Sequence, residues 1–191
     1  LWDTTLYLQT ADDTYTTQTG LGAATQGPGG FVDGKTTAGV SYCFVSSPAQ
    51  SMSISTTDIV TVITDTDFPA STTGTPAFLD GYVFVASAAS GQTRRIYNSA
   101  VGDETTWTAS GYIEAEEASG EIKALVRHHK YIVALCADRI EFFRNAGIPA
   151  PNSPLQRDTQ YLNSIGCVNR ATVATVGDVT YFVGREDNGV T

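Results

Sequence analysis

Two adjacent histidines, His128-His129, are the first side chains in this sequence whose type and spacing could perform chemistry. Neighbouring imidazoles can bind a metal ion or relay a proton. The pair lies at the edge of an expected strand, where adjacent side chains point to opposite faces. We therefore predict two exposed histidines that share neither a metal ion nor a proton.

Three glutamates, Glu114, Glu116 and Glu117, form the second candidate, because two carboxylates that flank a sugar ring can hydrolyse a glycosidic bond. Propeller-shaped glycosidases exist, so this alternative stays open. However, the sequence offers no identifiable partner residue and no cluster of sugar-stacking aromatics. An acidic turn in contact with solvent is the favoured interpretation.

The remaining motifs predict neither cofactor nor metal. Gly20-Leu21-Gly22 lacks the strand-to-helix context of a dinucleotide site, and Asp187-Asn188-Gly189 is first of all a hairpin turn rather than a calcium loop. Cys43, Cys136 and Cys167 are far apart and have no zinc-ligand spacing. Cys136 is expected in the core, as a small apolar residue. We predict no catalytic, cofactor-binding or metal-binding residue, no cofactor, and no enzyme activity.

The charge distribution limits the partners. The net charge is −9, from 11 basic and 20 acidic residues, and Lys35 is the only basic residue through position 92. Tight phosphate binding depends on lysine and arginine, so we expect no strong grip on nucleic acid, although DNA could pass nearby. Acidity that merely keeps the protein soluble explains the charge equally well. Arg94-Arg95 is the only adjacent basic pair, and we place it beside a hairpin turn.

The sequence has no long apolar run, so we predict no membrane insertion.

These residues must be positioned by strands, since hairpins recur along the sequence. Apolar strands are expected over 82–86, 131–135 and 179–183, each after a short turn and at intervals of about 50 residues. A repeat of this length built from strands is typical of a propeller blade. The alternative is an all-β sandwich whose hairpins merely have similar spacing. We predict an all-β fold, a β-propeller-like array of antiparallel hairpins with Gly/Thr-rich loops.

The strand after Asp138 has the clearest alternation. Ile140 and Phe142 are expected on its one dry face, whereas Arg139, Glu141 and Phe143 are expected on the other. Asn145-Ala146-Gly147 would end this strand with turn chemistry. Phe142 is therefore the predicted core ring.

Two regions are distinguished by composition. Residues 1–64 are a Thr/Ser/Gly-rich β segment with long loops, with strands expected over 2–8, 42–45 and 59–63 and a loop over 20–34. Residues 65–191 carry the hairpin repeats, with a loop over 101–107, a Pro-rich loop over 148–156, and a short helical turn or strand over 113–118. The sequence starts at Leu1 without Met and ends at Val190-Thr191, where another strand would begin. We expect it to be part of a longer chain.

Several short motifs occur in the same order as in one viral family. They are Asp67-Phe68-Pro69, Phe78-Leu79-Asp80-Gly81-Tyr82-Val83-Phe84, Asn98-Ser99-Ala100-Val101-Gly102-Asp103, Trp107, Ala115-Glu116, Ala124-Leu125-Val126-Arg127-His128-His129, Ile140-Glu141-Phe142, Asn145-Ala146-Gly147, Gln156-Arg157, Ile165-Gly166-Cys167 and Phe182-Val183-Gly184-Arg185-Glu186-Asp187-Asn188-Gly189. Over residues 68–189 the sequence resembles the packaged-DNA stabilisation family, the tail accessory (hub or nozzle) proteins of short-tailed bacteriophages. Before about residue 58 the resemblance is poor. The loop 151–155 lacks the Phe-Pro-Phe that is usual in the family.

The resemblance implies a structural virion protein of the phage tail. It would form a ring of its own copies, expected to be hexameric, below the portal and its adaptor, where it extends the DNA channel and retains the packaged genome. Implied partners are the portal-adaptor protein, tail needle, spike or fibre proteins, and genomic DNA that passes without specific binding. Assembly in the cytoplasm of the host bacterium is expected. A β-propeller that binds or depolymerises polysaccharide is the alternative function, and a generic propeller binding module is a third.

Overall fold

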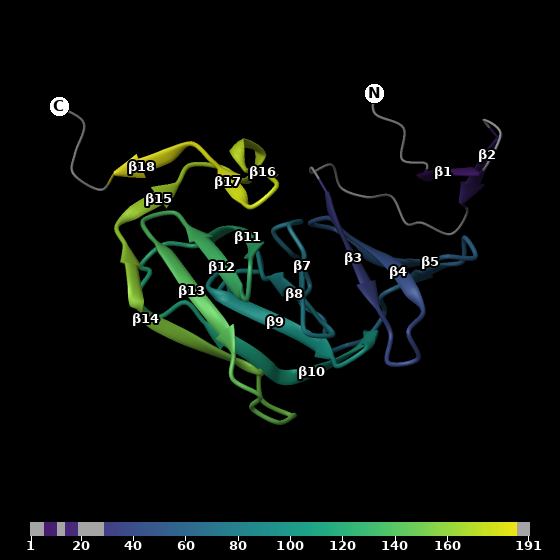
Figure 1. The fold of residues 1–191 in the computed structure, drawn as a ribbon, viewed down its shortest axis with the longest axis horizontal. Helices are drawn as coiled ribbons and strands as arrows, with labels where there is room; N and C mark the ends of the chain where they lie inside the picture. Colours follow the sequence, from purple (N-terminus) through teal and green to yellow (C-terminus); the bar gives the residue numbers. More distant parts are fainter. Residues whose placement is uncertain (1–5, 11–13, 19–28, 187–191) are drawn as a thin grey trace.

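A computed structural model gives the fold, and it describes residues 6–10, 14–18 and 29–186 (Figure 1). Three four-stranded antiparallel sheets follow one another along the chain, and in each the strands pair in sequence order. The first sheet contains β3 (Gly30–Lys35), β4 (Ser41–Ser46), β5 (Ser51–Ser55) and β6 (Val60–Val62). The second contains β7 (Ala77–Leu79), β8 (Tyr82–Ala86), β9 (Arg95–Ala100) and β10 (Asp103–Glu114). The third contains β11 (Ile122–His128), β12 (Tyr131–Cys136), β13 (Ile140–Asn145) and β14 (Leu155–Asn163).

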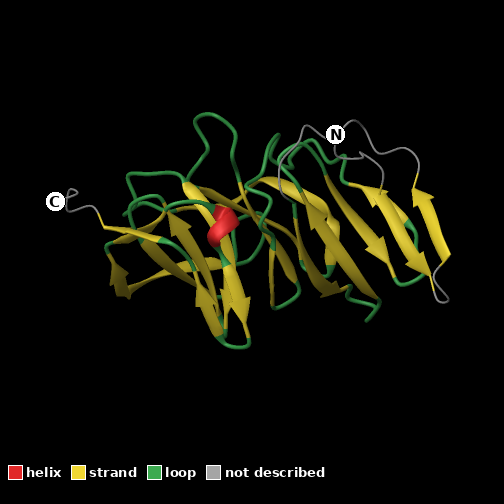
Figure 2. Cartoon of the chain, turned by 90° about the horizontal axis from the view of Figure 1, so that it is seen from above, coloured by secondary structure: helices red, strands yellow, loops and turns green. Residues whose placement is uncertain are grey.

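Shorter elements lie outside these sheets. Near the N-terminus β1 (Leu6–Thr10) pairs with β2 (Thr14–Gln18). After the third sheet, β15 (Ile165–Cys167) pairs with β18 (Gly184–Glu186), and β16 (Ala174–Val176) pairs with β17 (Val179–Tyr181). One turn of 3-10 helix, Arg170–Thr172, precedes β16. This is the all-β, antiparallel fold that the hairpin pattern predicts, and Figure 2 shows the strands of successive sheets standing side by side.

The turns explain how short sequences form these hairpins. Asp80 and Gly81 join β7 to β8, and both have positive φ, 51° and 87°. A two-residue turn of this kind matches the twist of the paired strands, and aspartate followed by glycine adopts it readily. The structure confirms the strands expected over 82–86, 131–135 and 42–45. The apolar run at 59–63 forms β6 over its central residues.

Both faces of the second sheet are buried. On β8, Val83 and Val85 pack toward the first sheet, whereas Phe84 and Ala86 pack toward the third sheet. We call the contact between the first and second sheets the first interface, and that between the second and third sheets the second interface. Side chains alternate across a strand, so a strand between two sheets must be apolar at successive positions. This is why the β8 and β12 sequences are continuous apolar runs.

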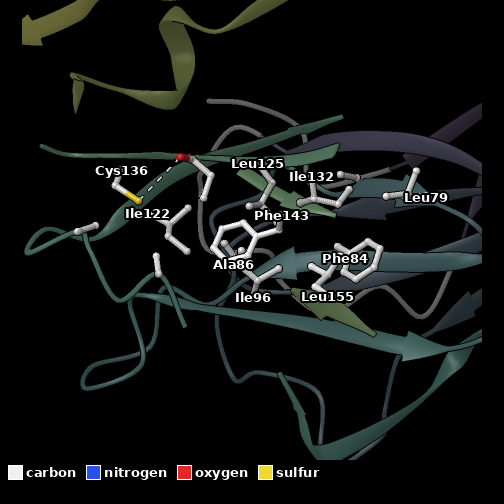
Figure 3. Close-up of a cluster of buried hydrophobic side chains, with 14 residues drawn as sticks. Leu79, Phe84, Ala86, Ile96, Ile122, Leu125, Ile132, Cys136, Phe143 and Leu155 are labelled. Atoms are coloured by element: carbon white, nitrogen blue, oxygen red, sulfur yellow. Dashed lines mark hydrogen bonds between the residues drawn. The ribbon is translucent and has the colours of Figure 1, made fainter. Parts of the chain in front are cut away.

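The second interface contains a large cluster of buried aliphatic residues around the ring of Phe143, which is 0% exposed (Figure 3). Ala86 and Ile96 contribute from the second sheet, and Leu125 and Ile132 from the third. The predicted alternation along β13 is correct, and the face of Ile140 and Phe142 is apolar and packed as expected, but the fully buried ring is Phe143 on the other face rather than Phe142. Phe142 is only partly buried and lies on the opposite face with Ile140, against β15 and the residues that follow it. Because sheets cover both faces of this strand, the idea of one dry face does not apply.

The structure corrects two loops as well. Residues 30–34 of the expected loop form most of β3, and residues 103–107 begin the long strand β10. Glycine weakens a strand, but at Gly34 it leaves room for a neighbour: a Cβ there would come within 2.4 Å of the Tyr42 ring. Over 113–118 the chain is strand to Glu114 and then irregular, without helix. The division at residues 64 and 65 falls between β6 and β7 and stays a prediction. Residues 2–5 of the earliest expected strand lie outside the described residues.

Candidate functional site

A charged cluster lies at the second interface, where the connection from β10 to β11 passes β13 and β14. Arg157 of β14 is its centre. Its Nη2 lies 3.1 Å from Glu116 Oε2, and its Nη1 lies 3.5 Å from Glu117 Oε1 and 3.6 Å from Glu141 Oε2. Arg157 pairs across the strands with Phe143, which places its side chain on the same face as Glu141. The cluster therefore joins the connection to the third sheet.

Glu141 is the buried member of the cluster, with 1% of its side chain exposed. Its Oε1 accepts a hydrogen bond of 2.8 Å from the backbone N–H of Ala118. Burial raises the pKa of the Glu141 carboxyl, because a charge is less stable away from water, and the Ala118 hydrogen bond and the Arg157 guanidinium oppose that rise only in part. This geometry fixes the position of the connection and offers no reacting group to solvent.

A second carboxylate holds the same connection from the β12–β13 turn. Asp138 accepts hydrogen bonds from the Ser119 N–H and hydroxyl, both 2.8 Å, and from the Gly120 N–H at 3.2 Å. Burial alone would raise the pKa of Asp138, but these hydrogen bonds outweigh it and lower that pKa. Two acidic side chains of the third sheet thus bind successive backbone groups of the connection.

Arg94 and Arg95, the adjacent basic pair, are engaged within the chain. Arg94 Nη1 donates to the Ala118 carbonyl at 2.9 Å, and Arg95 Nε donates to Glu114 Oε1 at 2.7 Å. The Arg95 guanidinium also lies 4.3 Å from the centroid of the Tyr112 ring. The sequence predicts this pair beside a hairpin turn, and the structure places it directly before and at the start of β9.

The three glutamates considered for glycoside chemistry all form ion pairs. Glu114 pairs with Arg95, Glu116 with Arg157, and Glu117 with both Arg157 and Arg139. The Glu116 side chain is 71% exposed, as an acidic turn would be. These ion pairs are better suited to holding the β10–β11 connection in place than to hydrolysing a glycosidic bond.

The histidine pair differs from its expected geometry. The two rings lie 4.4 Å apart in an edge-to-face arrangement instead of on opposite faces. The reason is that β11 ends at His128, and His129 has a positive φ of 52° in the turn. The alternation rule for strands therefore does not hold between these two residues. Within the described residues, no group of three or more metal-ligating side chains surrounds them.

The cysteines are free thiols in the described structure, and Cys136 is buried in the core as predicted. Burial raises the pKa of all three thiols, so none is an activated nucleophile. Gly20-Leu21-Gly22 and Asp187-Asn188-Gly189 lie outside the described residues. No helix in the described part of the chain is long and apolar enough to span a membrane.

Sequence reasoning missed the partnership of Glu141 with Arg157. Both residues belong to short motifs of the sequence, but they lie on different strands and were interpreted separately. The signal that could have found Glu141 is its place two residues before Phe143, on the same face of one strand. An acidic residue beside a core ring requires a partner, because an unpaired buried charge is costly.

The chain matches the model of a known family. The model of the family described as Bacteriophage P22 Gp10, beta-propeller, covers residues 28–191. The match includes the first sheet, so the expectation of poor resemblance before about residue 58 is wrong for residues 28–57, whereas residues 1–27 lie outside the match. That region has few distinctive motifs, and a family model adds many weak signals that motif inspection does not see. A search of curated proteins finds no match to the chain.

Proposed function

We propose a role in the phage tail, on the premise that this chain belongs to the bacteriophage P22 Gp10 β-propeller family, the packaged-DNA stabilisation proteins of short-tailed phages. Members are structural proteins of the virion. The finer role that we propose is a subunit of the ring below the portal and adaptor, which extends the DNA channel and helps to retain the genome. The observation that carries this proposal is the family match over residues 28–191.

The proposed partners follow from that position. Copies of the chain would form a ring, which we propose to be hexameric, and this ring would contact the portal-adaptor protein above and needle, spike or fibre proteins below. Assembly would occur in the host cytoplasm. The packing of the sheets supports a structural role, since a buried hydrophobic cluster joins each sheet to the next.

The same arrangement supports a protein without enzyme activity. Each glutamate of the acidic turn is paired with arginine, and burial keeps the thiols protonated. A polysaccharide depolymerase would need a pair of carboxylates of which one can act as an acid. We propose no catalytic residue, cofactor or metal for this chain.

Retention of DNA would be passive. Tight binding of DNA phosphates needs several free lysine or arginine side chains. Arg94 instead donates a hydrogen bond to the Ala118 carbonyl, and Arg95 forms an ion pair with Glu114. An acidic wall would repel the phosphates and let the genome slide once the channel opens. Closure by neighbouring subunits, rather than binding, would keep the genome inside.

Electron microscopy of the intact particle is the first test, and a ring of this protein around the channel below the adaptor is the expected result. In solution, the full-length protein should be monomeric or weakly associated alone and should bind adaptor-capped capsids, measured by size-exclusion chromatography with light scattering. Capsids that lack the adaptor are the control. Stable binding to sugar polymers with no binding to capsids would overturn the proposal and favour the polysaccharide alternative.

A salt titration tests passive retention separately. Binding of the purified protein to a short DNA duplex should be weak, and it should change little as salt is raised, because few counterions are released. The Arg94→Ala/Arg95→Ala variant should behave as the wild type does. A steep loss of affinity with salt that this double substitution abolishes would show that Arg94 and Arg95 bind the DNA phosphates, and it would contradict passive retention.

A further inference from the structure

A shallow cavity of about 260 Å³ is lined by turns and connecting segments of successive sheets. Each sheet and the segment after the third sheet contribute to its lining. The β4–β5 turn supplies Pro48, the approach to β7 supplies Thr72 and Thr73, the start of β11 supplies Lys123, and the segment after β15 supplies Asn169 and Arg170. A cavity built from four consecutive parts of the chain is positioned by the whole fold rather than by one flexible loop.

Arg170 is the unusual member of this lining. Within the described residues, Arg95, Arg139 and Arg157 all form ion pairs with carboxylates. The other arginines whose side chains donate do so to carbonyl or amide oxygens; they are Arg94, Arg127 and Arg144. Arg170 has neither kind of contact among the described residues, although it is partly buried. Burial lowers the pKa of Arg170. Its guanidinium N–H donors have no acceptor among the described residues and stay accessible, so they can bind a ligand in the cavity.

The other groups of the lining favour an anion. Lys123 adds a second positive charge, although Glu121 forms an ion pair with it and reduces its effect. Thr72 is nearly fully buried and is fixed by hydrogen bonds to Ser46 and Ser47, so the wall beside Arg170 is rigid. Arg170 and Lys123 against Glu121 leave the lining with a net positive charge.

We propose that this cavity binds a phosphate group, with the Arg170 guanidinium as its main ligand and Lys123 as a weaker one. The flat fork of guanidinium donors matches two oxygens of a phosphate, and such charge-assisted hydrogen bonds are stronger than neutral ones. With one cation that lacks an ion pair among the described residues, the affinity should be modest, with a dissociation constant on the order of millimolar. The site does not depend on the proposed tail role. One phosphate contact adds only a shallow salt dependence to DNA binding.

The test titrates inorganic phosphate into the full-length protein at constant ionic strength, followed by NMR of the arginine side chains. Saturable shifts at Arg170 are expected, and Arg170→Gln should weaken binding about tenfold, the effect of losing a charged hydrogen bond. The matched control is Arg185→Gln on the exposed strand β18, which should bind as the wild type does. Equal binding by wild type and Arg170→Gln, or no saturation, would overturn the site.

A second variant keeps the test informative if Arg170→Gln folds poorly, which circular dichroism would reveal. Lys123→Gln should weaken phosphate binding about threefold, the loss of a partly neutralised charge. An unchanged affinity in that variant would overturn the assignment of Lys123. Competition then identifies the source of the phosphate. A short duplex that displaces inorganic phosphate assigns the site to the nucleic-acid backbone, whereas a duplex that does not assigns it to free phosphate.

Discussion

The first and second interfaces are formed by sheets of the same topology, yet their side chains differ in kind. The first interface is aromatic: Trp107 lies 4.8 Å from Phe68 and 6.3 Å from Phe44, measured between ring centroids. Its buried polar contacts come from hydroxyls, such as the 2.6 Å hydrogen bond from Ser53 to Glu104. The second interface is mainly aliphatic and contains the buried carboxylate of Glu141.

This difference separates two ways of fixing one sheet against the next. Aromatic rings fill the space between sheets with directional edge contacts, and hydroxyls satisfy nearby acceptors without adding charge. The buried carboxylate of Glu104 in the first interface accepts such a hydroxyl hydrogen bond, whereas that of Glu141 in the second interface accepts a backbone N–H and lies beside the Arg157 guanidinium. A buried charge without such partners destabilises the fold. The second interface therefore defines the path of the β10–β11 connection more strictly, and its stability should depend more on pH.

The largest expected effect comes from removing the ring at the centre of the second interface. Phe143→Ala should lower the free energy of unfolding by about 3–5 kcal/mol, measured by urea denaturation, because the ring is fully buried. Phe44→Ala, equally buried in the first interface, should cost about the same. Phe142→Ala should cost about 2 kcal/mol, since that ring is partly exposed. A larger loss for Phe142→Ala than for Phe143→Ala would contradict the assigned faces.

The next effect tests the charge at the second interface. Arg157→Ala leaves Glu141 buried with no cation, and the free energy of unfolding should fall by about 3 kcal/mol at neutral pH. Because burial raises the Glu141 pKa, the folded protein holds this proton more tightly than the unfolded chain does. Stability from Glu141 is thus present below the ordinary carboxyl pKa and is lost as pH rises through the raised value.

The difference in the free energy of unfolding between Arg157→Ala and the wild type should accordingly become smaller in acid, because Glu141 becomes protonated. Adding Glu141→Gln to Arg157→Ala should recover much of the loss at neutral pH, since no buried charge remains. Urea denaturation at several pH values measures both effects. A gap that stays constant with pH would mean that Glu141 is not the source of the loss.

A smaller effect of opposite pH sign is expected at Asp138. Asp138→Ala removes three hydrogen bonds to Ser119 and Gly120 and should cost about 2 kcal/mol. Because the folded pKa of Asp138 is lowered, this contribution is present above the ordinary value of 3.8 and is lost as pH falls through the folded value. Asp138→Asn, which keeps one acceptor oxygen, is the control and should cost less. Equal losses for the two variants would argue against the hydrogen bonds.

The smallest effect concerns the hydroxyl contact of the first interface. Ser53→Ala removes a donor to the buried Glu104 carboxylate and should cost about 1.5 kcal/mol by urea denaturation. In a double-mutant cycle with Glu104→Gln, the two effects should not add, because the residues form one contact. Additive losses would show that Ser53 and Glu104 act independently. The hydroxyl contact would then not stabilise the first interface.

Local patterns in the sequence predicted much of the fold. Strand runs such as 82–86 and 131–135 and the Asp80-Gly81 turn follow from rules that act over a few residues, and these elements form as expected. The ordered motifs also indicated the family. The first sheet was only partly predicted, because glycine and serine are weak strand signals and Gly34 is favoured by its contact with the Tyr42 ring.

The charged cluster could not be predicted in the same way, because its members lie on different elements. Glu117, Glu141 and Arg157 meet only when the connection crosses the third sheet. Likewise, the histidine pair looked like two strand residues until the turn placed His129 outside the regular alternation.

By itself, the sequence determined where strands and turns occur, how side chains alternate along each strand, and that the chain is acidic, since these properties depend on neighbouring residues and composition. The tertiary structure was needed to show which ring of β13 is fully buried, which charges are paired, and that Arg170 lines a cavity without an ion pair among the described residues. The physical reason is that burial and pairing depend on what packs against a strand. In a stack of sheets both faces of a strand have neighbours, and those neighbours come from distant parts of the chain.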